Sequence, residues 1–421
     1  MLAECFYRKD VFSMAKIAVL GYGVVGSGTV EVFFKNKENL EKKAGQELDI
    51  KYILDVRDFD DSPYKDKFVK DFDIILNDPE VTVIAEVIGG LKFSYPYVKS
   101  ALEAGKSVVT SNKELVAAKG AELLTIAKEK NVNFFFEASV GGGIPIIKPI
   151  HTCLEANEID EIAGILNGTT NFILTKMIRD GMGFDEALKI AQDLGYAERD
   201  PSADVDGHDT CRKICILAAL AYGKHVYPES VHTEGITKVT LEDVEYADSC
   251  DCKIKLIGCA KREEGNDISI GVFPAFVKDD SQLAGVNDVF NAILVRGDAT
   301  GDVVFYGKGA GKLPTASAVV SDIVSAVKHD KTSRSLTWTD SEQSFVRDFD
   351  DFTCADYIRV KGASKEAVVA AFGKVEFLSR KNAPAGELAF ITPVMSEKDT
   401  VAACEKLIGA DILGRIRVLD Y

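Results

Sequence analysis

An aspartate and a lysine four residues apart are candidates for proton chemistry. Asp209 directly precedes the apolar stretch Thr210–Tyr222, and Lys213 lies inside it. The composition of this stretch predicts a buried helix. Residues four apart project from one face of a helix, so the two side chains should meet. An exposed ion pair is the commonest outcome of this spacing. Here the apolar neighbours favour a pair at the border of a cleft, where a lysine could exchange a proton with a developing alkoxide.

A glycine-rich turn, GYGVVG at residues 21–26, joins a short apolar run to a predicted helix. Gly21 permits a tight turn, Gly23 lets the backbone approach a pyrophosphate, and Gly26 allows the helix to pack closely on the strand. The N–H groups that begin the helix, at Val24 and Val25, would then meet the phosphates. This spacing alone is a weak signal, but after the first strand of a βαβ unit it predicts a nicotinamide dinucleotide site and hydride transfer.

Three charged residues near the end of the second predicted strand, Ile50–Val56, could select the coenzyme. Asp55 and Asp58 could accept hydrogen bonds from the ribose 2′-hydroxyl of NAD, whereas Arg57 could hold the 2′-phosphate of NADP. A position that simply faces solvent is the plainer alternative for each. We expect NADP and keep NAD as the alternative.

Two further polar segments could take part in chemistry. Thr110–Glu114 follows an apolar strand, so Lys113 would face the ligand crevice at the carboxyl edge of a parallel sheet, although a lone lysine is more often surface decoration. Asn167–Asn171 (NGTTN) carries small hydrogen-bonding groups that suit a polar pocket or a capping turn. His208 should point away from Asp209 on the helix, so we assign it no acid–base role.

The elements that must position these residues alternate regularly in the first third of the chain. The predicted strands are apolar runs separated by helical stretches, the first of which runs from Val24 to about Lys43. These strands are Ala15–Leu20, Ile50–Val56, Val81–Ile88 and Ser107–Thr110. This order predicts an α/β fold with a parallel sheet, a Rossmann-type dinucleotide-binding domain over residues 1–138. Residues 312–330, a helix-like stretch after a second glycine cluster, should pack back on it.

The remaining chain predicts two more domains. Residues 139–311 read as an α+β domain that begins near the glycine-rich loop Gly141–Pro145, with predicted helices at Phe184–Leu194 and Thr210–Tyr222 and a strand at Ile268–Phe273. A polar hinge, Asp330–Gln343, precedes residues 350–421. These residues predict the ferredoxin-like order βαββαβ. The predicted strands are Tyr357–Val360, Val375–Phe377, Glu387–Ile391 and Ile412–Val418, and the predicted helices are Ser364–Gly373 and Glu397–Leu407.

Composition excludes several classes of function. The 421 residues are 46% hydrophobic and 28% charged, which is enough for two or three packed cores. The net charge of −16 argues against nucleic acid or an anionic membrane surface as a partner. The nine cysteines form no zinc pattern and no CxxC pair, which predicts reduced thiols and a cytoplasmic protein. Residues 1–13 lack the apolar core of a signal peptide, and a start at Met14 would lose no predicted element.

Seven segments, in this order, resemble homoserine dehydrogenases. They are Gly21–Gly26, Thr110–Lys113, Glu137–Pro145, Gly164–Asn171, Gly195–Pro201, Gly207–Lys213 and Gly309–Thr315. The resemblance runs from about residue 16 to 330. It implies an NAD(P)H-dependent interconversion of L-aspartate 4-semialdehyde and L-homoserine, in threonine, methionine and isoleucine biosynthesis. It also implies that residues 139–311 serve catalysis and dimerisation.

The resemblance also implies roles for individual residues. Lys213 looks like the proton donor to the aldehyde oxygen, Asp209 like its substrate-side partner, and Glu198 like a ligand of the substrate amino group. Lys113 looks like a second catalytic lysine that also touches the coenzyme. Gly311 falls where the family's C-terminal glycine turn approaches the dinucleotide.

A monovalent cation and an effector are implied in the same way. The family's cation loop matches Glu137 with the carbonyls of Val140, Gly142 and Ile144, which implies bound sodium or potassium. Residues 350–421 resemble an ACT regulatory module and imply L-threonine as an effector, although Val360–Ser364 lacks the usual Asp-x-Pro-Gly signature. We expect a homodimer or homotetramer, because two-fold assemblies are common and ACT-like sheets often pair.

Two alternatives would use the same motifs differently. An acylating semialdehyde dehydrogenase needs a thiolate and a histidine base. Cys153 and His151 are close in sequence, but residues two apart need not meet. A catalytically silent sensor of dinucleotide and amino acid would have no need of Lys113, Glu198 and the Asp209–Lys213 pair together.

Overall fold

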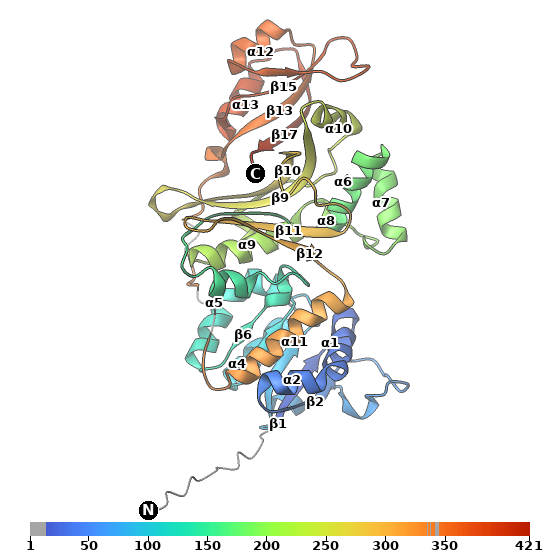
Figure 1. Ribbon diagram of the computed structural model, residues 1–421, viewed down its shortest axis with the longest axis vertical. Coiled ribbons are helices and arrows are strands. Elements are labelled where there is room, and N and C mark those ends of the chain that lie inside the picture. Colours follow the sequence, from blue (N-terminus) through green and yellow to red (C-terminus); the bar gives the residue numbers. More distant parts are fainter. Residues whose placement is uncertain (1–13, 335, 337, 342–344) are drawn as a thin grey trace, which may run out of the picture. The chain divides into compact units, whose positions relative to one another are not determined.

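The computed structural model describes residues 14–334, 336, 338–341 and 345–421. The predicted dispensable segment 1–13, and the parts of the predicted hinge at 335, 337 and 342–343, lie outside the described residues. The chain divides into two compact units, residues 1–143 with 311–337 and residues 144–310 with 338–421. Each unit has its own sheet (Figure 1).

The sheet of the first unit has the strand order that the glycine turn predicts. Its six strands are parallel and lie in the order β3-β2-β1-β4-β5-β6, the order of doubly wound dinucleotide-binding domains. Both faces of the central strands are covered, which is why these strands read as continuous apolar runs. The strands are β1 (Met14–Leu20), β2 (Glu47–Leu54), β3 (Phe68–Val69), β4 (Val81–Glu86), β5 (Ser107–Thr110) and β6 (Phe134–Phe135). The predicted α/β class is confirmed.

A helix from far along the sequence completes this unit. The orange helix α11 lies beside the blue α1 in Figure 1, and their apolar residues, among them Phe33 and Ile323, share one core with β1 and β2. A Cβ atom at Gly28 of α1 would lie 2.8 Å from the carbonyl oxygen of Lys312, so the two helices touch near their N-terminal ends. The helices are α1 (Val24–Lys35), α2 (Lys37–Ala44), η1 (Lys65–Lys67), α3 (Phe72–Leu76), α4 (Ser94–Glu103), α5 (Lys113–Glu129), η2 (Glu137–Ser139) and α11 (Lys312–Lys328).

Three predicted elements of this unit, the first helix and the second and third strands, differ from the structure, and the third strand ends at Glu86 instead of Ile88. The single helix expected from Val24 to about Lys43 is two helices, because Asn36 leaves helical backbone angles, with φ −109° and ψ 12°. The second strand ends at Leu54 instead of Val56. The Asp55 carboxylate there accepts hydrogen bonds from the backbone N–H groups of Tyr22 and Arg57, which turns the chain out of the sheet.

The sheet of the second unit is longer and mixed. Its main path is β12-β11-β7-β9-β10-β17-β13-β15-β14, with β8 paired to β10 and β16 paired to β13. The strands before the C-terminal residues are β7 (Ile159–Ile165), β8 (His232–Thr233), β9 (Cys252–Arg262), β10 (Ile268–Lys278), β11 (Phe290–Gly297) and β12 (Gly301–Lys308). Strand β10 extends five residues beyond its predicted end at Phe273, since Val277 still packs in the core.

The buried helix of this unit is α9, which carries Asp209 and Lys213. A Cβ atom at Gly258 of β9 would lie 2.9 Å from the Thr210 methyl group, so the helix lies directly on the sheet. The helices before the C-terminal residues are η3 (Pro149–Cys153), α6 (Gly168–Asp180), α7 (Phe184–Asp193), α8 (Ser202–Val205), α9 (His208–Tyr222), η4 (Pro228–Ser230), α10 (Leu241–Asp248) and η5 (Glu264–Asn266). Among all the described helices, none combines the length and apolar composition that a membrane span requires.

The C-terminal residues have the predicted ferredoxin-like order. The fourth long strand lies beside the first, in the order β17-β13-β15-β14. Strand β17 also pairs with β10, where Ala275 lies opposite Arg417, so these residues share a sheet with the rest of the second unit (Figure 1). The elements are η6 (Phe349–Asp351), β13 (Thr353–Lys361), α12 (Lys365–Phe372), β14 (Glu376–Leu378), β15 (Glu387–Ile391), β16 (Met395–Ser396), α13 (Glu397–Glu405) and β17 (Asp411–Leu419).

Candidate active site

Asp209 and Lys213 form a buried ion pair on α9. The Lys213 ammonium donates hydrogen bonds to Asp209 Oδ2 at 2.8 Å and to the carbonyl oxygen of Leu166 at 2.7 Å. Lys213 is 7% exposed and Asp209 is 5% exposed. The predicted meeting of the two side chains therefore occurs, and it occurs out of bulk water. Leu166 follows β7, so strand and helix together fix the position of the ammonium.

The amide of Asn167 joins this pair to a second acid. Its Nδ2 donates to Asp209 Oδ2 at 2.8 Å and to Asp204 Oδ1 at 2.6 Å. Its Oδ1 accepts from the N–H of Thr170 at 2.8 Å and so caps α6. The NGTTN segment thus serves both as a capping turn and as part of a polar cluster. Asp204 received no role from the sequence, although it lies in the acid-rich stretch before α9.

Two other polar residues near this cluster lie apart from the ion pair. Glu198 is exposed, in the loop between α7 and α8, and its backbone carbonyl accepts from Gln192 Nε2 at 3.2 Å. The same loop is tied to α6, because Thr169 Oγ1 donates to the Tyr196 carbonyl at 2.7 Å. His208 is exposed at the first position of α9. The loop that carries Glu198 therefore lies near the start of α6. The Glu198 carboxylate itself lies outside the buried network of Asn167, Asp209 and Lys213.

In the first unit, the glycine turn has a shape that suits a pyrophosphate. Gly21 has φ +98°, and a Cβ atom at Gly26 would lie 1.9 Å from the Gly21 carbonyl oxygen. A Cβ atom at Gly23 would have no heavy atom within 4 Å. The backbone at Gly23 is therefore open to a ligand directly before the N–H groups of Val24 and Val25 that begin α1.

Asp55 and Arg57 lie beside this turn as an ion pair. Arg57 Nε and Nη2 each donate to Asp55 at 2.9 Å, and this guanidinium lowers the pKa of Asp55 to about 2. The Arg57 guanidinium also lies 5.1 Å from the centre of the Phe59 ring. Asp58 lies apart from them, in an exposed ion pair with Lys70 at 2.6 Å.

The carboxyl edge of β4 and β5 carries Lys113 and an acid that sequence reasoning missed. Lys113 is the first residue of α5, which Asn112 caps. Glu86 ends β4 and is fully buried; it accepts from Thr110 Oγ1 at 2.6 Å and from the N–H of Ile88 at 2.8 Å. Burial raises the pKa of Glu86. The signal in the sequence that could have identified Glu86 is its position as an acidic residue at the end of the apolar run Val81–Glu86.

The other predicted site residues of this unit lie at helix ends. Gly311 has φ +124° and precedes α11, next to the contact between α11 and Gly28. Glu137 lies buried in η2, and its N–H donates to Asp322 Oδ2 at 2.9 Å. Val140 and Gly142 are buried in the same unit, whereas Ile144 begins the second. Within the described ranges, no cluster of three or more His, Cys, Asp or Glu side chains is arranged for a metal.

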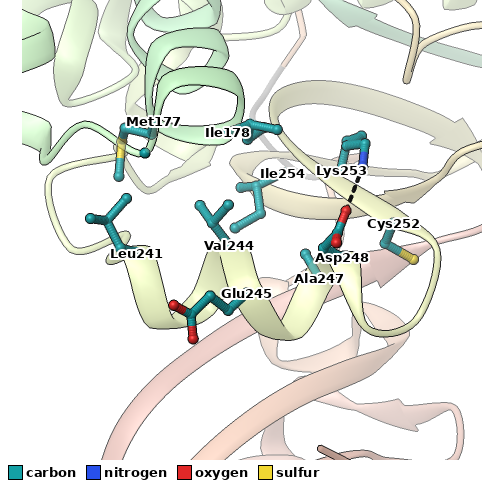
Figure 2. A pocket seen from close by; sticks show the side chains of 11 residues that line it. Met177, Ile178, Leu241, Val244, Glu245, Ala247, Asp248, Cys252, Lys253 and Ile254 are labelled. Atoms are coloured by element: carbon teal, nitrogen blue, oxygen red, sulfur yellow. Dashed lines mark hydrogen bonds and ion pairs between the residues drawn. The ribbon is translucent and has the colours of Figure 1, made fainter. Parts of the chain in front are cut away.

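Two features away from these clusters bear on the alternatives. A cavity of about 320 Å³ between α6, α10 and β9 is lined by Met177, Val244 and the Lys253–Asp248 ion pair, and by no predicted site residue (Figure 2). Cys153 is exposed, and the hydrogen-bond neighbour of its thiol is Thr152 at 3.7 Å. The acylating alternative therefore finds no cysteine–histidine contact at Cys153.

Comparisons with known proteins point to one family. The family model of the homoserine dehydrogenase NAD-binding domain matches residues 21–137, and the homoserine dehydrogenase model matches residues 145–324. A homoserine dehydrogenase of Bacillus subtilis is 43% identical over 319 residues, which are 75% of this chain and 73% of that protein. One of Synechocystis is 44% identical over 324 residues, 74% of this chain and 73% of that one.

Solved structures give the same result, in one case over nearly the whole chain. A homoserine dehydrogenase from Thiobacillus denitrificans matches with a TM-score of 0.88 and 35% identity, over 97% of this chain and 98% of that one. A hyperthermophilic archaeal homoserine dehydrogenase in complex with NADPH matches with a TM-score of 0.64 and 30% identity, over 74% of this chain and 97% of that one. The chain belongs to the homoserine dehydrogenase family of NAD(P)-dependent oxidoreductases.

Proposed function

We propose that Lys213 is the proton donor and Asp209 its partner in the interconversion of L-aspartate 4-semialdehyde and L-homoserine. The observation that carries this proposal is the buried ammonium held between Asp209 Oδ2 and the Leu166 carbonyl. A lysine fixed in this way can deliver a proton to the aldehyde oxygen and recover it from the homoserine hydroxyl. Asp209 and Asn167 keep the ammonium in place, and Glu198 binds the substrate amino group.

The coenzyme, NADP with NAD as the alternative, supplies or accepts the hydride when it is bound. The open backbone at Gly23 and the N–H groups of Val24 and Val25 would hold its pyrophosphate, with Gly21 and Gly26 shaping the turn. Arg57 would bind the 2′-phosphate, and Gly311 would approach the dinucleotide. Lys113, at the carboxyl edge of the sheet, would touch the coenzyme and stabilise negative charge on the reacting oxygen.

Further features of the family are proposed for this chain as well. Buried Glu137 and the carbonyl oxygens of Val140, Gly142 and Ile144 are oxygen ligands of the kind that sodium or potassium prefers. The C-terminal βαββαβ residues would act as an ACT-like module that binds L-threonine. The protein would be a cytoplasmic homodimer or homotetramer, with no nucleic acid or membrane partner.

The test compares two buried lysines of the same unit. In Lys213→Met, the rate of homoserine oxidation should fall by about 10²- to 10⁴-fold, because a positioned proton donor and acceptor is lost. Affinity for NADPH, measured by nicotinamide fluorescence, should not change. Lys255→Met removes a lysine that is 1% exposed and lies outside the ion pair, and this control should keep its turnover. Near-normal turnover of Lys213→Met would contradict the proposal.

A further inference from the structure

Glu234 lies where a buried arginine of the C-terminal residues meets the rest of the second unit. Arg417 of β17 is 3% exposed and its Nη2 donates to Glu234 Oε1 at 2.9 Å and to Glu397 Oε2 at 3.1 Å. His232 Nε2 lies 2.6 Å from the same Glu234 oxygen, and the His232 ring stacks on Phe349 with 3.8 Å between ring centres. Glu234 is thus held from two sides.

Aromatic rings support the arginine. The Arg417 guanidinium lies 4.6 Å from the centre of the Phe273 ring and 4.9 Å from that of Phe349. Burial alone would raise the pKa of Glu234, but hydrogen bonds from His232 and Arg417 lower it to about 2. The charged form of the carboxylate, which is the form that binds Arg417, is therefore favoured.

The backbone beside Glu234 packs against the turn between α8 and α9. The N–H of Ile236 donates to the Val205 carbonyl at 2.8 Å, and a Cβ atom at Gly235 would lie 2.0 Å from that oxygen. Gly207, with φ +86°, is also near this segment, because a Cβ atom there would lie 3.2 Å from the Glu234 carbonyl oxygen. Backbone lies on backbone here, so a shift of residues 234–236 must shift the turn.

That turn separates the two acids that Asn167 joins. Asp204 lies in α8, before the turn, and Asp209 lies in the first turn of α9, after it. Both accept hydrogen bonds from Asn167 Nδ2, and Asp209 also holds the Lys213 ammonium. A small displacement of the turn therefore moves the Asp209–Lys213 pair relative to Asn167 and the Leu166 carbonyl, and misplacement of about 1 Å can cost up to a hundredfold in rate.

We propose that Glu234 is a positioning residue for the Asp209–Lys213 pair: it ties Arg417 of the C-terminal βαββαβ residues to the turn from which α9 begins. This inference rests on the proposed function of that pair. It gives the C-terminal residues a part in turnover that needs no effector, because Arg417 of their last strand binds Glu234, whose neighbouring backbone packs on the turn before the catalytic helix.

The test is Glu234→Gln in the full chain, which leaves Arg417 with Glu397 as its remaining carboxylate. The kcat for homoserine oxidation should fall at least about tenfold, while the Kd for NADPH stays unchanged because the glycine turn belongs to the first unit. Glu234→Asp, which keeps the charge, should recover part of the loss in kcat. A role confined to stability would leave kcat alone and lower only the melting temperature.

The matched control is Asp356→Asn. Asp356 accepts from Arg415 Nε at 3.0 Å, and the half-buried Arg415 also binds Glu397, so this variant likewise leaves an arginine with Glu397 alone. Among the described residues, no hydrogen bond or ion pair joins Asp356 to residues 205–207. Asp356→Asn should lower the melting temperature as Glu234→Gln does and leave kcat unchanged.

Three results would overturn the inference. The first is a Glu234→Gln enzyme whose kcat stays within twofold of that of the parent, while its melting temperature falls by as much as that of the Asp356→Asn control. The second, which applies if Glu234→Gln does not fold, is a normal kcat in Gly235→Ala, which pushes the same turn with the ion pair intact. The third is equal loss of kcat in Asp356→Asn. If Lys213→Met were also active, the catalytic assignment itself would be at fault; an inactive Lys213→Met would leave that assignment standing.

Discussion

We expect the choice between NADP and NAD to depend on two side chains of opposite charge, Asp55 and Arg57. In an NAD enzyme, a carboxylate at the end of the second strand accepts hydrogen bonds from the ribose 2′-hydroxyl. Both oxygens of Asp55 already accept hydrogen bonds, one from the Tyr22 N–H and both from the Arg57 side chain. The Arg57 side chain remains 59% exposed. A phosphate group could therefore bind the guanidinium without displacing Asp55, which favours NADP.

Replacing Arg57 should change coenzyme preference more than turnover. Arg57→Ala removes a charge-assisted contact worth about 1.5–3 kcal/mol, so kcat/KM for NADP should fall by about 10- to 100-fold and that for NAD by far less. The measurement is the initial rate of homoserine oxidation with each coenzyme. Lys70→Ala, which removes a nearby exposed cation paired with Asp58, is the control and should affect both coenzymes little. Equal losses with NADP and NAD in Arg57→Ala would argue against phosphate recognition.

At the scale of elements, the glycines of the turn at residues 21–26 meet two different requirements, one of folding and one of binding. Gly26 has no room for a side chain because of the Gly21 carbonyl, so it is a packing requirement. Gly23 has φ −78° and ψ −152°, an extended conformation that any residue adopts, and open space around it. A methyl group at Gly23 would therefore meet only the ligand.

Two glycine variants should separate these requirements. Gly23→Ala should melt at the same temperature as the parent without coenzyme, and it should lose most of the increase in melting temperature that NADPH produces. Gly26→Ala should melt at a lower temperature even without coenzyme, because the new atom overlaps the Gly21 carbonyl. Thermal melting with and without NADPH measures both. A Gly23→Ala protein that NADPH stabilises as well as the parent would rule out pyrophosphate binding at this turn.

Much of the first sheet could be predicted because buried parallel strands are plain apolar runs. Strands β1 and β5 and helix α9 follow their predicted ranges within two residues. The break at Asn36 was not predicted, since the Lys- and Glu-rich sequence around it favours helix on both sides. Glu86 was missed because an acid that ends an apolar run looks the same whether it faces solvent or is buried among hydrogen bonds.

In the site as well, a contact within one helix could be predicted, and contacts between distant segments could not. The Asp209–Lys213 contact was predictable, since it follows from spacing on one helix. The Asn167 contacts with Asp204 and Asp209 span 37 and 42 residues, and the contact between Glu234 and Arg417 spans 183. The last depends on the register of β17 against β10. The sequence predicts that β17 exists and gives no indication of which strand of the second unit it joins.

At the scale of the whole molecule, the Lys255 ammonium is buried and donates hydrogen bonds only to neutral oxygens. Lys255 is 1% exposed; its ammonium donates to the Val286 carbonyl at 2.5 Å and to Asn171 Oδ1 at 3.3 Å. No carboxylate forms an ion pair with it among the described residues. Burial lowers the pKa of Lys255 from 10.5 to about 8. Folding therefore carries an electrostatic penalty at neutral pH that depends on the proton bound to this one group.

This penalty should make stability depend on pH with a defined sign. Below about pH 8, Lys255 is protonated in both states, and the shift costs the folded state about 3 kcal/mol. Between pH 8 and 10.5 the unfolded chain binds the proton more tightly than the folded one, so stability rises with pH and the penalty is gone above 10.5. Other groups titrate as well, so the quantity to measure is the melting temperature of the parent minus that of Lys255→Met, from about pH 7 to pH 11. That difference should shift in favour of the parent across the alkaline range. A constant difference would mean that the ammonium keeps its proton, and that the Val286 and Asn171 oxygens alone compensate for its burial.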